Sequence, residues 1–139
     1  MRAALLVCLV LLFSHGSIAR ETAIAVVVSE KSAIRELSHA DIAAVFLGQL
    51  GSTKASHPLT PIDSEEPQLR DEFYRTLLGR SQNQMRAYWS RMVFIGQGKP
   101  PRQISRDILH REIANIPDVI GYIPADQVRS GLRTVYLLH

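Results

Sequence analysis

The sequence predicts an α/β fold built on a mixed, partly parallel sheet. Stretches typical of strands and helices alternate along it, in the order strand, helix, strand, three helices, two strands. The first predicted strand, at 22–28, is an apolar, largely β-branched run of the kind that is covered on both faces. The length of 139 residues, with 46% hydrophobic and 21% charged residues, suits one compact domain and excludes a disordered chain.

Capping residues and apolar spacing predict where the helices begin and end. Each helix is expected to begin at a serine and to end at a glycine or before a proline. The expected ranges, caps included, are 38–48, 64–79, 81–96 and 105–116. The second helix is expected to carry Glu65 and Glu66 in its first turn, with Pro67 close behind. The remaining strands are expected at 59–63, 119–123 and 132–138, with loops at 49–57 and 96–102.

The first nineteen residues have the layout of a secretory signal peptide. Arg2 precedes an apolar run at 3–13, and a small-x-small site at 17–19 predicts cleavage before Arg20. The run is too short to span a bilayer, and an uncleaved amphipathic anchor is the alternative. We therefore expect a signal peptide at 1–19 and a single periplasmic domain at 20–139, without stable membrane insertion after cleavage. Cleavage also removes Cys8, which excludes disulfides from the mature domain.

The charge is mild and rests mostly on arginine. The chain has 16 Lys or Arg against 13 Asp or Glu, a formal charge of +3, and only three of the cations are Lys. Arginine suits recognition of anions and carboxylates, and an Arg-rich coding bias in the source genome explains the preference equally well. The charge is too small and too scattered to predict a nucleic-acid partner.

No constellation of residues predicts catalysis, a metal site or a cofactor. The histidines have no ligand spacing, and no nucleophile elbow or phosphate loop is present. Glu65 and Glu66 are either an acid/base pair or the acidic start of a helix. Tyr88 and Trp89 either line a pocket or belong to the core. We expect a protein that is not an enzyme.

The candidate binding site is placed where two predicted strands lead into polar residues. In open α/β sheets, ligands sit beyond the carboxyl ends of strands, where helix N-termini present free N–H groups to anions. The ends of the strands at 22–28 and 59–63, with the 96–102 loop, are therefore the candidate region. Ordinary turn and cap residues are the alternative. The candidate ligand-binding residues are Ser29, Lys31, Ser32, Ser64, Arg70, Lys99 and Arg102.

Four stretches of the sequence resemble the phosphate-type substrate-binding proteins of ABC transporters. They are Leu37–Gly48, with the pattern L-S-x-x-D-I-x-x-V-F-L-G; P-I-D at 61–63 with the later Phe73-Tyr74; Tyr88–Pro101; and Pro117–Ile123, with P-x-V-I-G-Y-I. The 88–101 stretch resembles a small, single-lobe subgroup. The resemblance implies a single three-layer lobe of the type II periplasmic-binding-protein kind. It also implies phosphate or another oxyanion as ligand, and an ABC permease or a membrane sensor as partner.

The chain departs from that family at the anion site. The family carries an Arg and then Ser-Gly-Thr where residues 63–70 read D-S-E-E-P-Q-L-R, and Glu65 and Glu66 would repel phosphate. The leading hypothesis is a periplasmic solute-binding protein that binds an oxyanion for uptake or sensing. The alternative is a single-lobe protein-interaction module that docks on a membrane sensor or channel without a small-molecule ligand.

Overall fold

The computed structural model describes residues 22–49 and 58–139. The predicted signal peptide at 1–19 and residues 50–57 of the predicted loop lie outside the described residues. The strands are β1 (Ile24–Ser29), β2 (Thr60–Ser64), β3 (Arg102–Ile104), β4 (Val119–Pro124) and β5 (Leu132–Leu138). The helices are α1 (His39–Phe46), α2 (Pro67–Leu78), α3 (Gln82–Phe94) and α4 (Arg106–Asn115), with a short 3₁₀ turn at Ala125–Gln127.

The five strands form one mixed sheet in the order β3-β2-β4-β1-β5. β2 pairs in parallel with β3 and with β4, whereas β1 runs antiparallel to β4 and β5. The expected α/β class with a partly parallel sheet is confirmed. β3 was not predicted: it begins at the last residue of the stretch predicted as a loop, and three residues behind two prolines are too few to give a recognisable strand pattern.

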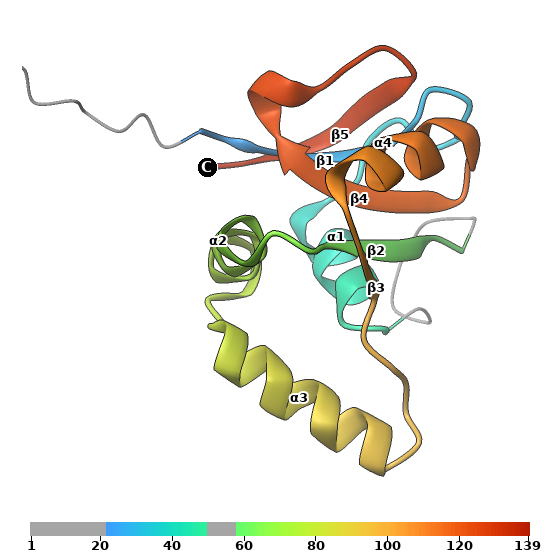
Figure 1. The fold of residues 1–139 in the computed structure, drawn as a ribbon. Helices are drawn as coiled ribbons and strands as arrows, with labels where there is room; N and C mark the ends of the chain where they lie inside the picture. The colour runs from blue at the N-terminus through green and yellow to red at the C-terminus, as the bar shows by residue number, and fades with distance from the viewer. Residues whose placement is uncertain (1–21, 50–57) are drawn as a thin grey trace, which may run out of the picture.

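Helices cover both faces of the sheet and make three layers (Figure 1). The residues of β1 are all buried and divide between two cores. Val26 and Val28 belong to the larger core under α1 and α2, whereas Ala25 and Val27 belong to the smaller core under α4. This alternation follows the two-residue period of a strand and explains why β1 is a continuous apolar run.

Aromatic rings fill the larger core beside the candidate site. The Phe73 and Tyr122 rings stack with centroids 3.7 Å apart and planes 4° apart, and Phe46 meets both rings edge-on. These three side chains are among the largest that are fully buried. Aromatic contacts of this kind stabilise a core beyond the area they bury, so α1, α2 and β4 are held together at this point.

On the other face, Gly121 of β4 allows α4 to approach the sheet. A Cβ atom at this position would lie 2.7 Å from Ile113 Cδ1 and 3.3 Å from Ile62 Cγ1. Both neighbours are buried, so neither has free space to move into. The glycine therefore sets the spacing between α4 and the sheet.

The helix boundaries agree with the capping prediction, with two exceptions. Ser38 and Ser81 form capping boxes, as expected. Ser105 occupies the N-cap position of α4 without a side-chain hydrogen bond to the helix. At α2 the prediction is wrong by two residues: Ser64 ends β2, and the helix begins at Pro67 with Glu66 as its N-cap. Proline is common at the first position of a helix because its φ angle is already helical and because the N–H that it lacks would have no partner within the helix there.

The third helix stands apart from the layers. α3 follows α2 through a turn at Gly79, whose φ of 65° ends α2, and reaches away from the sheet (Figure 1). Only Met85 and Trp89 of α3 are buried. The larger part of the helix surface is thus left to solvent, and an open hollow lies beside α3.

Candidate functional site: a groove beside α3

An open groove of about 700 Å³ lies between α3 and the part of the molecule formed by α2, β2 and β3. Its polar lining residues are Asp63, Arg70, Gln82, Arg86, Ser90 and Gln103. Its apolar lining residues are Tyr74, Met85, Trp89, Val93, Phe94 and Pro100. A mainly apolar hollow with a few convergent polar groups is the usual form of a small-molecule site.

Arg70 brings a positive charge into this groove. It lies in the first turn of α2, and its Nη1 donates to the Ser64 carbonyl oxygen at 2.6 Å and to Gln103 Oε1 at 3.4 Å. No carboxylate lies within ion-pair distance of Arg70 among residues 22–49 and 58–139. The guanidinium is held in place by neutral acceptors, so its charge is not cancelled by a direct partner and its other N–H groups remain for a ligand.

Asp63, at the end of β2, forms a buried hydrogen-bonded cluster with two tyrosines. Its carboxylate accepts from the Tyr122 hydroxyl and, at 3.1 Å, from the Tyr74 hydroxyl. The backbone N–H of Ser64 donates to the same carboxylate at 3.2 Å. Burial raises the pKa of Asp63, and the hydroxyl donors and the nearby Arg70 charge oppose that rise. Burial and the Asp63 charge raise the pKa values of both tyrosines, which therefore stay protonated as donors.

The two glutamates at the start of α2 do not act as a pair. Glu66 accepts two hydrogen bonds from Arg106, both at 2.7 Å, and these bonds lower the pKa of Glu66. Glu65 is exposed, and neither glutamate lies in the first turn of the helix, contrary to the prediction. The charge of Glu66 is thus balanced by α4, and its expected repulsion of an anion is reduced.

The wall of the groove on the α3 side belongs to the core as well. Trp89 is only 8% exposed, as the core interpretation predicted, and its ring also lines the groove. Tyr88 packs edge-on against Trp89, and its hydroxyl donates to the Leu47 carbonyl oxygen at 2.8 Å. Both alternatives therefore hold for Trp89, whereas Tyr88 is half-buried against the core and is not a lining residue of the groove.

Ser29, Lys31 and Ser32 lie at the opposite end of the sheet from Ser64. β1 runs antiparallel to β4, and β4 runs parallel to β2, so the carboxyl ends of β1 and β2 point in opposite directions. The expectation that both strand ends contribute to one region is therefore wrong. Ser29 donates through its Oγ to the Ala114 carbonyl oxygen at 3.0 Å, and Ser32 Oγ accepts from the Ile34 N–H at 3.2 Å, which are structural contacts.

The remaining candidates divide between the groove and its surroundings. The buried Ser64 accepts from the Glu66 N–H at 3.1 Å through its Oγ, beside Arg70. Lys99 is exposed in the loop after α3. Arg102 pairs with Glu112 of α4 at 2.6 Å, on the far face of the sheet from the groove. The structure thus places Ser64 beside Arg70, of which only Arg70 lines the groove, and places Arg102 elsewhere.

The polar residues of the site that sequence reasoning missed include Asp63, Gln103, Tyr122 and, on α3, Arg86. An acidic residue at the end of a buried strand is the one local signal that pointed to Asp63. Gln103 reaches Arg70 only because β3 pairs with β2 in a register that places Gln103 opposite Asp63. In the sequence Tyr122 is an ordinary strand residue, and only the pairing of β4 with β2 brings its hydroxyl to Asp63. Such convergence depends on tertiary structure.

Across residues 22–49 and 58–139, no group of three or more His, Cys, Asp or Glu side chains is arranged to hold a metal ion. The same residues contain no helix with the length and apolar character that a membrane crossing requires.

Comparison with known proteins supports the fold alone. No protein-family model and no curated protein sequence matches the chain. The fold is similar to an ABC-type phosphate transport receptor from Vibrio cholerae, with a TM-score of 0.61 and 12% identity. It is also similar to a protein from Clostridium perfringens assigned as a phosphate ABC transporter substrate-binding protein, with bound phosphate, with a TM-score of 0.59 and 16% identity. Each match covers 82% of this chain and 45% of the other.

The class defined by the fold is a periplasmic-binding-protein-like α/β lobe. This confirms the fold that the sequence resemblance implied. The chain spans less than half the length of either similar structure.

Proposed function

We propose that this chain is a periplasmic solute-binding protein that takes an anion into the groove beside α3, for uptake or sensing. The observation that carries the proposal is Arg70, a guanidinium held by the Ser64 carbonyl and Gln103 and facing a hollow of about 700 Å³. Similarity of fold to two phosphate-transport binding proteins supports a solute-binding role. The predicted signal peptide supports a periplasmic location.

The groove favours an anion that also carries an apolar part. Arg70 and Arg86 supply positive charge, and Met85, Trp89 and Pro100 supply apolar surface. A guanidinium whose donors already point into a site binds an oxyanion with little further ordering. An organic oxyanion with an apolar part therefore suits this groove better than inorganic phosphate.

Calorimetric titration of the purified protein tests the proposal. Inorganic phosphate, sulfate and phenyl phosphate present the same kind of charged group with and without an apolar ring. We expect phenyl phosphate to bind most tightly. Because Trp89 is the single tryptophan of the chain and lines the groove, its fluorescence should change in parallel with the heat. The absence of both signals at millimolar ligand for all three anions would contradict the proposal.

Two arginine variants make the test specific. Arg70→Gln removes the charge that lines the groove, and the loss of a charge-assisted bond of about 1.5–3 kcal/mol should weaken binding about tenfold or more. Arg75→Gln removes a charge one turn further along α2, where Arg75 pairs with Asp71 at 2.6 Å outside the groove. We expect this control to bind like the unchanged protein. Equal losses in both variants would mean that general charge, and not the groove, attracts the anion.

A protein-interaction module is the second candidate function. The chain spans 45% of each similar structure, so more than half of each of those proteins has no counterpart here. Such a single lobe would dock on a membrane sensor or channel through the surface beside α3. Capture of one defined partner by the unchanged protein and not by Phe94 variants, together with the absence of anion binding, would favour this candidate.

A further inference from the structure

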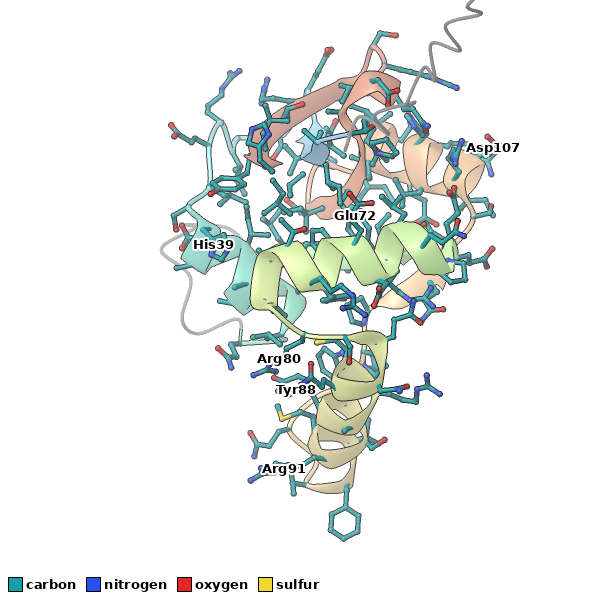
Figure 2. All side chains as sticks on the ribbon, turned by 90° about the vertical axis from the view of Figure 1, so that its left-hand side faces the viewer. His39, Glu72, Arg80, Tyr88, Arg91 and Asp107 are labelled. Carbon is teal, nitrogen blue, oxygen red and sulfur yellow. The ribbon has the colours of Figure 1, made fainter. Side chains whose placement is uncertain are left out.

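The far end of α3 carries the most exposed large apolar residues that the structure describes. Val93, Phe94 and Ile95 follow one another there and are 55%, 91% and 50% exposed. The other large apolar side chains with comparable exposure stand singly on other elements. Figures 1 and 2 show α3 pointing away from the rest of the molecule, with this end outermost. Apolar side chains that no neighbouring element covers are unfavourable in water, and such a patch marks a surface that another molecule contacts.

The region around this apolar point is positively charged throughout. Residues 73–106 include seven Lys or Arg and no Asp or Glu. Three of the seven pair with carboxylates of neighbouring elements. The other four have no ion-pair partner in the described parts of the chain, and all lie on α3 or within five residues of it: Arg80, Arg86, Arg91 and Lys99. Figure 2 shows Arg80, Tyr88 and Arg91 in succession toward the far end of the helix.

We propose that the α3 tip, defined as Val93, Phe94 and Ile95 with Arg91 and Lys99, docks on the surface of an anionic phospholipid bilayer. Apolar side chains that enter the boundary between headgroups and acyl chains, flanked by cations, are the features that attach a protein to such a surface. Arg91 precedes Phe94 by three residues, about 4.5 Å along the helix axis. When Phe94 lies in the acyl boundary, Arg91 is thus placed at the level of the lipid phosphates.

The shape of the tip favours lipid over an acidic protein partner. A stable protein interface buries about 1,200 Å² or more and relies on large complementary surfaces. Three consecutive side chains at the end of one projecting helix offer a small, convex contact. A bilayer accepts a convex apolar point anywhere on its surface and needs no matching pocket. Val93 and Phe94 also line the groove. The proposal is tested without solute, so its outcome is distinguishable from that of the anion titration.

Vesicle binding tests the proposal directly. We would sediment the purified protein with vesicles of pure phosphatidylcholine and with vesicles of equal parts phosphatidylcholine and phosphatidylglycerol. We expect binding to the anionic vesicles alone, weakened by salt. Phe94→Ser should lower the partition coefficient about tenfold or more, since it removes one large buried apolar side chain. The double variant Arg91→Gln with Lys99→Gln should also lower it about tenfold or more, from the loss of two cations near the surface.

Matched controls separate the tip from the rest of the surface. Ile116→Ser changes an apolar residue that is 45% exposed on the α4 side, and Arg111→Gln with Arg129→Gln removes two exposed cations away from α3. Neither control should change vesicle binding. Loss in the charge variant with none in Phe94→Ser would overturn the proposal, because charge alone would then hold the protein. The proposal would also be overturned if the protein did not bind anionic vesicles and instead formed a dimer that dissociates in the Phe94→Ser variant.

Discussion

The buried Asp63 cluster makes a stability prediction that depends on pH. Tyr122→Phe removes the hydroxyl that donates to Asp63 and keeps the ring that stacks on Phe73 at 3.7 Å. A hydrogen bond to a charged acceptor contributes about 1.5–3 kcal/mol, and one to a neutral acceptor about 0.5–1.5 kcal/mol. We therefore expect a loss of about 2 kcal/mol where Asp63 is ionised and about 1 kcal/mol where Asp63 is protonated.

The direction of the pH effect follows from the raised pKa of Asp63. A carboxyl group with a higher pKa in the native state than in the unfolded chain holds its proton more tightly when folded. Its contribution to stability is therefore greatest at low pH and falls as the pH rises through the native pKa. Removal of the Tyr122 donor raises the pKa of Asp63 further. The stability lost in the variant should thus be larger near pH 8 than near pH 4.5.

Urea denaturation followed by circular dichroism measures this difference. With a slope of about 1–3 kcal/mol per molar urea for a small domain, a loss of 2 kcal/mol lowers the midpoint by about 1 M. Tyr88→Phe is the control, since the Tyr88 hydroxyl donates to the neutral Leu47 carbonyl oxygen at 2.8 Å. Its loss should be about 1 kcal/mol at both pH values. Equal losses at the two pH values for Tyr122→Phe would refute the assignment of Asp63 as the titrating group.

Two further predictions concern packing and capping. Gly121→Ala should lower the free energy of unfolding by about 1–3 kcal/mol, because the new methyl meets Ile113 at 2.7 Å. Ile113→Val removes the clashing Cδ1 atom and should make the glycine substitution less costly in a double-mutant cycle, so strict additivity of the two changes would argue against the clash. Ser81→Ala should lower the free energy of unfolding by about 1 kcal/mol and Ser105→Ala by clearly less, because of these two serines only Ser81 makes a side-chain cap. Equal losses in thermal unfolding would contradict the observed caps.

Local patterns in the sequence predicted most of the fold. The capping boxes at Ser38 and Ser81 and the left-handed glycine at 79 act within a few residues, so their signals are readable without tertiary structure. The three-residue β3 gave no such signal, because a strand this short is defined by its partner β2. The start of α2 was misplaced because Ser64 is a preferred N-cap residue type, whereas Glu66, which occupies the N-cap position, is not and makes no side-chain cap.

The candidate site was harder to predict from the sequence because it depends on the direction of one strand. An alternating order of strands and helices suggests parallel pairing, and on that basis the ends of β1 and β2 were grouped. β1 is instead antiparallel to β4, which carries Lys31 and Ser32 to the opposite end of the molecule from Arg70. Nothing within β1 itself encodes that direction. Ser64 and Arg70 were found because Ser64 is the last residue of β2 and Arg70 lies in the first turn of the helix that follows.

The most direct test of the anion site is to map where phenyl phosphate changes the NMR spectrum of the labelled protein. Our account places the largest shifts on the amide signals of Ser64, Arg70 and Gln103 and on the indole N–H of Trp89. Signals from Glu30 to Ser32 should stay where they are. Shifts that gather at that far end of the sheet, with none around Arg70, would contradict the account.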